Sequence, residues 1–237
     1  MVKGPPVRDR NDIQQYEDLV DAWWRPEAAF AALHWLAAAR GRLVPRPLVA
    51  GEVLLDLGCG GGLMAPYASS YRHVGVDLVA SALTVAAGHD VLAVRGDGAR
   101  LPIAEGTASV VVAGEVLEHV RELDAVVAEV CRVLRPGGTV VVDTISATRA
   151  ARVALVAIAE RLPGGPPPRV HDPHLFVCPD RLVGLFSEHD VDLRVWGIRP
   201  SALDYARFLA NRRHPVRMVP TPSMALVYQG VGRKADP

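Results

Sequence analysis

The sequence has few of the features that mark secreted, zinc-ribbon or membrane-spanning proteins. Its three cysteines are widely separated and form no Cys-x-x-Cys pair, so neither a disulfide framework nor a zinc ribbon is predicted. The first residues are polar, which argues against a signal peptide. No run approaches the roughly 18 consecutive apolar residues that cross a bilayer. We therefore expect a cytoplasmic protein.

An excess of either charge is also missing. Lys and Arg together number 26, and Asp and Glu together number 26. Because nucleic-acid-binding surfaces normally have a basic surplus, nucleic acid is not an expected partner. The 237 residues, half of them hydrophobic, suit one globular domain with a sizeable core. No internal repeat is visible, and nothing in the sequence indicates an oligomeric state.

Short apolar runs alternate with amphipathic stretches through the middle of the chain. Five runs rich in β-branched residues predict strands, at 53–57, 73–77, 90–94, 109–113 and 139–143. Nearly continuous apolar runs of this kind suit strands that are buried on both faces of a parallel sheet. Helical patterns lie between them at 63–70, 80–88 and 123–134. Strands that alternate with helices predict an α/β fold with a Rossmann-like, mostly parallel sheet and helices on both faces.

The two ends of the chain complete this fold. Residues 16–42 have apolar side chains at helical spacing and are followed by Pro45 and Pro47, which predicts an N-terminal helical cap. We expect residues 1–48 to form the lead and cap, and 49–237 the main domain. Beyond Asp143, helices are predicted at 149–162, 178–189 and around 202–210. Two last strands at 192–198 and 224–232 bring the expected total to seven.

A glycine-rich loop, Asp56-Leu57-Gly58-Cys59-Gly60-Gly61-Gly62, joins the first predicted strand to a helix. Glycines there allow a tight turn and a close approach of the backbone to a ligand. Asp77 ends the second strand about 20 residues later, where an acidic side chain can accept both hydroxyls of a ribose. A dinucleotide-binding protein is the competing interpretation, but its third glycine is replaced here by Leu63.

Further motifs separate these two interpretations. Gly96-Asp97 follows the third strand, and Arg132-Val133-Leu134-Arg135-Pro136-Gly137-Gly138 leads into the fifth. Together with the loop at Asp56 and with Asp77, this order resembles the class I methyltransferases that depend on S-adenosylmethionine (SAM). The resemblance implies that SAM is the methyl donor and that the enzyme acts on a small-molecule acceptor.

A cluster of acidic and imidazole side chains follows the fourth strand. Glu115, Glu118 and His119 stand at positions i, i+3 and i+4, which lie on one face if this turn is helical. Two carboxylates and an imidazole suit Mg²⁺, and the histidine also admits Zn²⁺, Mn²⁺ or Fe²⁺. The alternative is that the cluster only shapes the pocket and binds no metal.

Segments on both sides of the fold narrow the resemblance to one subgroup. Tyr16, Trp23 and Trp24 precede the fold, and the segment Val170-His171-Asp172-Pro173-His174-Leu175-Phe176 follows it. With the Glu-x-x-Glu-His cluster they resemble the ubiquinone-biosynthesis O-methyltransferase (UbiG) family, which methylates polyprenylated catechols. The resemblance implies a divalent cation at Glu115, Glu118 and His119. It also implies SAM contacts from these residues: Arg40, Asp56, Gly58, Cys59, Gly60, Asp77, Leu78, Asp97, Gly98, Gly114 and Glu115.

Methyl transfer to oxygen requires a deprotonated or polarised hydroxyl, and three side chains are candidates for providing it. These catalytic candidates are His119, Glu115 and His171. A bound cation lowers the pKa of a coordinated catechol oxygen; without one, His119 or His171 would act as the general base. His171 and His174 could instead be ordinary polar groups of a loop.

The predicted helix at 149–162 allows three interpretations. It has arginines near both ends, and could lie weakly on an anionic membrane surface, cover the substrate pocket, or be a buried helix with charged ends. For the whole protein, an N- or C-methyltransferase of a small metabolite and a non-catalytic SAM-binding protein remain open. A nucleic-acid methyltransferase is disfavoured because no Asn-Pro-Pro-Tyr or Asp-Pro-Pro-Tyr tetrapeptide follows the fourth strand.

Overall fold

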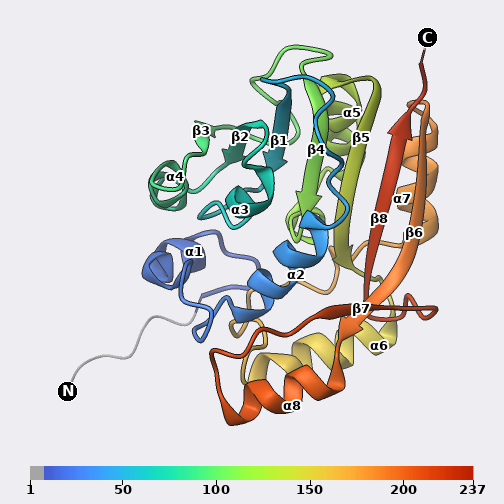
Figure 1. Cartoon of the computed structure of the whole chain (residues 1–237). Helices are drawn as coiled ribbons and strands as arrows, with labels where there is room; N and C mark the ends of the chain where they lie inside the picture. Colours follow the sequence, from blue (N-terminus) through green and yellow to red (C-terminus); the bar gives the residue numbers. More distant parts are fainter. Residues whose placement is uncertain (1–7, 237) are drawn as a thin grey trace.

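One mixed sheet organises the molecule, which is represented by a computed structural model that describes residues 8–236. Its strands run in the order β3-β2-β1-β4-β5-β8-β6-β7 (Figure 1). Their bounds are β1 Val53–Leu57, β2 Arg72–Asp77, β3 Leu92–Arg95, β4 Ala108–Gly114, β5 Leu134–Ile145, β6 Val191–Pro200, β7 Met218–Thr221 and β8 Val227–Lys234. Strands β1 to β5 pair in parallel, and β8 lies antiparallel between β5 and β6. The Rossmann-like α/β fold is therefore confirmed.

The sheet has eight strands rather than the expected seven. The additional strand, β7, pairs antiparallel with β6 at the edge of the sheet. Its four residues include Pro220, which cannot donate to a ladder and is therefore confined to edges of sheets. A run this short, with proline inside it, has no alternation that would predict a strand.

Helices cover both faces of the sheet. Helices α5 (Leu123–Val133) and α7 (Pro179–Ser187) cover one face, where Val126, Leu182 and Phe186 are buried in the largest hydrophobic cluster. Helices α2 (Ala31–Gly41), α3 (Ala65–Ala68) and α4 (Ala80–Ala87) lie on the other face (Figure 1). Valines 110 and 112 of β4 contribute to the cluster on that side, and Val111 to the first. This explains the nearly continuous apolar run of β4.

The expectation of one helix over 16–42 is wrong. The chain forms α1 (Gln14–Asp18), a 3-10 turn η1 (Val20–Ala22) and, after a break, α2. Pro26 lies in the break, where it has no amide hydrogen to donate. The Trp24 indole N–H donates to the Gly61 carbonyl at 2.8 Å. Tertiary contact of the tryptophans with the glycine-rich loop thus overrides the helical spacing of the apolar residues.

The segment expected as a helix at 149–162 is also irregular. It consists of α6 (Arg149–Ala151), a π-type stretch η3 (Arg152–Ile158) and a 3-10 turn η4 (Ala159–Arg161). Leu155 and Leu162 line the large cavity described below, which supports the pocket-cover interpretation. Val153 and Ile158 are more than half exposed, and weak membrane contact stays a prediction. Within residues 8–236, no helix is long and apolar enough to cross a bilayer.

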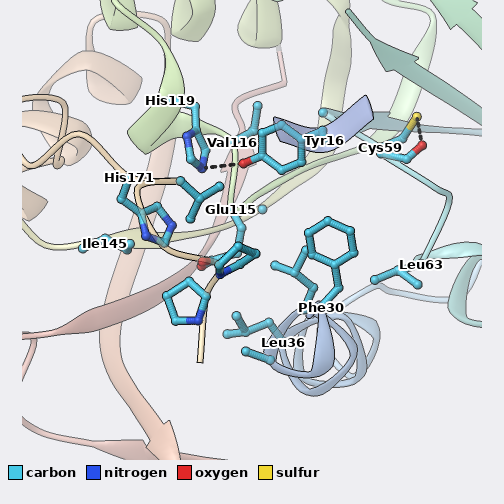
Figure 2. A pocket seen from close by; sticks show the side chains of 18 of the residues that line it. Tyr16, Phe30, Leu36, Cys59, Leu63, Glu115, Val116, His119, Ile145 and His171 are labelled. Atoms are coloured by element: carbon cyan, nitrogen blue, oxygen red, sulfur yellow. Dashed lines mark hydrogen bonds between the residues drawn. The ribbon is translucent and has the colours of Figure 1, made fainter. Parts of the chain in front are cut away.

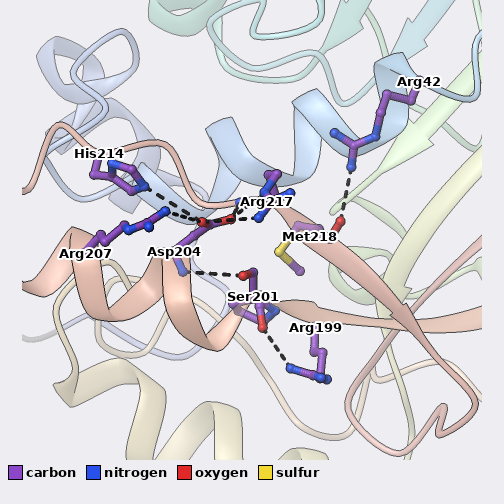
Figure 3. Close-up of polar contacts among 9 residues, drawn as sticks. Arg42, Arg199, Ser201, Asp204, Arg207, His214, Arg217 and Met218 are labelled. Carbon is purple, nitrogen blue, oxygen red and sulfur yellow. Dashed lines mark hydrogen bonds and ion pairs between the residues drawn. The ribbon is translucent and has the colours of Figure 1, made fainter.

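A polar network joins α8 (Ala202–Ala210) to β7 beside this segment (Figure 3). The Ser201 hydroxyl caps the helix by accepting from the Asp204 amide, and Arg217 Nε donates to Asp204 Oδ2 at 2.6 Å. Arg207 and His214 also face the Asp204 carboxylate. The Arg217 guanidinium beside Asp204 lowers the pKa of that carboxyl to about 2.

We expect Asp204→Asn to lower the melting temperature at pH 7, and the difference from wild type to narrow as the pH falls. The folded-state pKa of Asp204 lies below the unfolded value of about 3.9, so its contribution is present above that value and is lost as the pH falls toward 2. Melting curves at pH 7 and pH 3 test this. Asp192→Asn, which removes an exposed pair with Arg194, is the matched control and should change neither curve. A difference that stays constant with pH would contradict the expectation.

Candidate functional site

A single large cavity lies at the carboxyl ends of β1, β2 and β4. Its volume is about 1220 Å³, larger than the about 300–1,000 Å³ of ordinary small-molecule pockets. Eleven expected SAM-contacting residues all line it: Arg40, Asp56, Gly58, Cys59, Gly60, Asp77, Leu78, Asp97, Gly98, Gly114 and Glu115. Apolar side chains, among them Phe30, Leu33 and Met218, also line it. The cavity therefore has room for a donor and an acceptor side by side.

The glycine-rich loop has the backbone that glycine permits. Gly58 has φ 67° and Gly60 has φ 49°, both in the left-handed region. A Cβ atom on Gly60 would lie 2.3 Å from the Trp23 ring, which covers the loop. A side chain at this position would displace the indole, so the close approach of Trp23 depends on glycine.

Asp77 occupies the position expected for a ribose-binding acid. Its Oδ2 accepts from the Gly60 amide and its Oδ1 from the Val79 amide, each at 2.8 Å. These bonds fix the carboxylate at the end of β2 and use one acceptor site of each oxygen. A carboxylate has about four such sites, so both oxygens can accept a further donor. Burial raises the pKa of Asp77.

Arg40 reaches the cavity from α2. Its Nη1 donates to Asp143 Oδ1 at 2.6 Å, and both side chains are buried. Gly114 makes this path possible, since a Cβ there would lie 2.3 Å from Nη1. Arg40 Nε is buried without a hydrogen-bond partner among the described residues. A buried unpaired guanidinium N–H is costly, so this atom fits a ligand carboxylate.

Asp143, the partner of Arg40, is not among the site residues predicted from the sequence. A signal for it exists, because Asp143, like Asp56 and Asp77, is an acid near the carboxyl end of an apolar parallel strand. Its side chain also accepts from Gln229 Nε2 at 3.4 Å. Asp143 therefore anchors Arg40 to β5.

The turn after β4 is only partly helical, although the carboxyls of Glu115 and Glu118 remain close enough to shift each other's pKa. Glu115 has φ 53°, in the left-handed region, and a 3-10 turn η2 spans Leu117–His119. Because Glu115 departs from helical geometry, it does not share a helical face with Glu118 and His119 as the spacing implied. Burial, followed by the negative charges of Glu118 and Asp143, raises the pKa of Glu115 well above its usual range.

The group that the fold does bring together consists of Glu118, His119 and His171. One potential ligand atom from each lies within 4.8 Å of the other two. The two imidazoles stack with their ring centroids 5.2 Å apart, and both line the cavity (Figure 2). Glu118 is completely buried; its Oε2 accepts from the Thr144 hydroxyl at 2.8 Å. Glu118 Oε1 and His171 Nδ1 have no hydrogen-bond partner within residues 8–236.

Burial sets the charge of this group. It lowers the pKa of His119 to about 4 and raises that of Glu118 to about 7. Burial, together with the nearby His119, also lowers the pKa of His171 well below its usual value. Both imidazoles are therefore neutral at pH 7 and each has a lone pair to offer to a proton or a cation.

Two other expected participants lie elsewhere. Glu115 lines the cavity but is outside this group of three. His174 does not line the cavity; its backbone amide donates to the Asp172 carboxylate at 3.0 Å. Asn11 and Tyr16, which no sequence motif marks for a chemical role, both contact the His119 ring. Their distance from His119 in sequence left no local pattern to detect.

Comparison with known proteins identifies the family of this chain. Residues 55–142 match a family model described as a methyltransferase domain. The ubiquinone biosynthesis O-methyltransferase of Burkholderia lata is 32% identical over 198 residues, which cover 78% of this chain and 84% of the relative. The chain belongs to the family of the ubiquinone biosynthesis O-methyltransferases. It is a SAM-dependent methyltransferase.

Solved structures share the fold of this methyltransferase. A SAM-dependent methyltransferase from Thermotoga maritima superposes with a TM-score of 0.65 at 15% identity, covering 93% of this chain and 98% of its own. A phosphoethanolamine N-methyltransferase of Haemonchus contortus, in complex with SAM, gives a TM-score of 0.61 at 12% identity, covering 93% of this chain and 60% of its own. At these identities the likeness concerns the fold.

Proposed function

We propose that this methyltransferase transfers the methyl group of SAM to a phenolic hydroxyl of a catechol-type small molecule. The observation that supports the proposal best is that His119 and His171, grouped with the buried Glu118, line the same cavity as the expected SAM-contacting residues. Neutral imidazoles beside the proposed SAM site suit an acceptor whose hydroxyl must lose a proton. The relatives' role in ubiquinone biosynthesis supports a catechol with an apolar tail.

The donor end of the cavity determines how SAM would lie. Asp77 would accept the ribose hydroxyls, and Arg40 Nε would donate to the carboxylate of the methionine part. Asp97 and Gly98, after β3, would lie beside the adenine. With these contacts, the methyl group would lie near the carboxyl end of β4. His119 follows this strand and would face the acceptor.

The reaction itself is one substitution. The bond between the methyl carbon and sulfur breaks, a bond between that carbon and the phenolic oxygen forms, and S-adenosylhomocysteine leaves with the electron pair on sulfur. The phenolic proton must leave the oxygen. His119 and His171 are the candidate acceptors for it, because their rings are neutral and face the cavity. The Glu118 carboxylate, whose pKa is near 7, can balance the positive charge of a neighbouring imidazolium.

The same three side chains fit a divalent cation. Glu118 Oε1 and His171 Nδ1 are buried and have no partner among the described residues, and one carboxylate with two imidazoles is a common donor set for Zn²⁺, Fe²⁺ or Mn²⁺. When bound, such a cation lowers the pKa of a coordinated phenol. We therefore propose Glu118, His119 and His171 as the ligands, with Glu115 as a neighbouring carboxyl rather than a ligand.

The acceptor end of the cavity has apolar walls that suit an aromatic ring with an apolar substituent. Leu33 and Leu36 of α2 face it from one side, and Leu155 and Leu162 of the segment 149–162 from another. Apolar walls also exclude water, which strengthens the interactions of the buried polar groups. A phenol with an apolar tail would bury more surface here than a charged metabolite.

Methyl transfer to catechols and monophenols, with and without a prenyl substituent, tests the proposal. We expect turnover with catechols in the presence of Mn²⁺, Zn²⁺ or Fe²⁺ and a loss of at least about tenfold in EDTA, as expected when a cation lowers the pKa of the nucleophile. Unchanged turnover in EDTA would still support an O-methyltransferase, and it would favour a histidine rather than a cation as the group that activates the hydroxyl. Binding of SAM without turnover on any phenol would contradict the proposed acceptor class and favour an N- or C-methyltransferase.

A further inference from the structure

Asn11, in the N-terminal segment, contacts His119 at two points, one on the backbone and one on the ring. Asn11 Nδ2 donates to the His119 backbone carbonyl at 2.9 Å, and Asn11 Oδ1 lies 2.6 Å from His119 Nδ1. The two residues are 108 positions apart in the sequence. One primary amide therefore contacts both the backbone and the ring of the same histidine.

This pair of contacts determines the tautomer of the ring. A backbone carbonyl can only accept, so the amide group that faces it must be the Nδ2 donor. The opposite atom, Oδ1, must then face His119 Nδ1, and because an amide oxygen also only accepts, the proton must be on Nδ1. The remaining ring nitrogen, Nε2, has the lone pair. The backbone thus determines which imidazole nitrogen can bind a proton or a cation.

The Tyr16 hydroxyl contacts the Nε2 side of the His119 ring. It lies 3.3 Å from His119 Nε2 (Figure 2) and donates to this nitrogen in the tautomer that Asn11 imposes. A long hydrogen bond from a neutral hydroxyl is a weak competitor. An acceptor hydroxyl or a cation that approaches Nε2 from the cavity can therefore replace it at small cost.

Backbone contacts hold Asn11 beside His119. Asn11 has φ 59°, a left-handed conformation that asparagine tolerates better than most residues. Its backbone N–H donates to the Arg169 carbonyl at 3.1 Å. The neighbouring Arg10 donates from Nη1 to the His171 carbonyl at 2.9 Å. The segment is thus fastened beside both histidines of the site.

We propose that Asn11 is a positioning residue, which holds His119 as its Nδ1–H tautomer with the Nε2 lone pair toward the acceptor. The inference rests on the proposed function, because it assigns His119 as the ring that receives a proton or binds a cation there. Partners that fix the tautomer of a reactive or ligating histidine typically change affinity or activity by about 10–100-fold when removed. Asn11 also lines the cavity, and the role assigned to it here acts through His119.

Nitrogen NMR of histidine-labelled protein, without SAM or acceptor, tests the tautomer directly. The sequence has eight histidines, and a His119→Gln spectrum identifies the signals of His119. We expect the wild-type ring to be protonated at Nδ1. Asn11→Gly keeps the left-handed backbone and removes the amide, so a mixture of tautomers is expected. Asn11→Asp retains an acceptor for Nδ1–H and should keep the wild-type tautomer.

Gln15→Ala is the matched control. Gln15 Nε2 ties the same segment to the Arg169 carbonyl at 3.1 Å without touching His119. It should lower the melting temperature and leave the tautomer unchanged. If Asn11→Gly changes the tautomer only as much as Gln15→Ala does, the effect is structural and the positioning role is wrong. A wild-type ring protonated at Nε2 would overturn the proposal outright.

Kinetics complete the test. Asn11→Gly is expected to lower kcat by about 10–100-fold with an unchanged KM for SAM, and Asn11→Asp to restore most of the loss. A kcat within twofold of wild type for Asn11→Gly would overturn the positioning role. Because the NMR measurement needs no substrate, failure of the catechol assay alone would count against the proposed function and leave the assignment of the tautomer intact.

Discussion

Replacing His119 with alanine is expected to lower kcat by about 10²–10⁴-fold, the usual contribution of a positioned acid or base. The neutral ring, with a pKa near 4, faces the cavity between Glu118 and His171 and is the imidazole whose orientation is most tightly determined. SAM binding should change little, because His119 is not among the expected SAM contacts. The loss should therefore be in kcat rather than in the KM for SAM.

Steady-state kinetics with varied SAM and with varied acceptor separate these effects. His174→Ala is the matched control, since His174 belongs to the same loop as His171 but does not line the cavity. It should retain wild-type kcat, and His171→Ala should resemble His119→Ala. Equal losses in His174→Ala and His119→Ala would show that the loop rather than the imidazole group matters, and would contradict the assignment.

The lining of the proposed donor half of this cavity could be predicted from the sequence because its signals are local. The glycine-rich loop begins at the end of β1, Asp77 is the last residue of β2, and the carboxyl ends of parallel strands meet at one edge of the sheet. Their positions depend on turn chemistry and strand order, both of which short-range patterns record. All the expected donor-side residues accordingly line one cavity.

The acceptor half depends on contacts that spacing does not record. The helical spacing of Glu115, Glu118 and His119 predicted one face, but the left-handed backbone of Glu115 breaks the turn. His171 reaches Glu118 and His119 from a loop after the irregular segment 149–162, and Asn11 reaches His119 from the N-terminal segment. A sequence pattern shows neither a loop's final position nor a single left-handed residue, so the tertiary fold decides both.

Replacing Asp77 with alanine is expected to raise the dissociation constant for SAM by about 10²–10⁴-fold. Hydrogen bonds to a charged group contribute about 1.5–3 kcal/mol each, and about 1.4 kcal/mol corresponds to a tenfold change. Two ribose hydroxyls bound to one carboxylate account for an effect of this size. Isothermal titration calorimetry with SAM, or with S-adenosylhomocysteine as the product, measures it without any acceptor.

Asp77 also supports the loop, since its oxygens accept from the Gly60 and Val79 amides, so the alanine variant loses two structural bonds as well. Asp77→Asn separates the two roles. The asparagine oxygen can still accept from one backbone amide, but its amide group cannot accept from a second donor. We expect an intermediate loss of affinity, about tenfold, at a smaller cost in melting temperature. If Asp77→Asn and Asp77→Ala differ in stability but bind SAM as tightly as wild type, Asp77 is only a scaffold for the glycine-rich loop. If affinity falls in the order wild type, asparagine, alanine while Asp77→Asn remains as stable as wild type, the carboxylate itself binds the ribose.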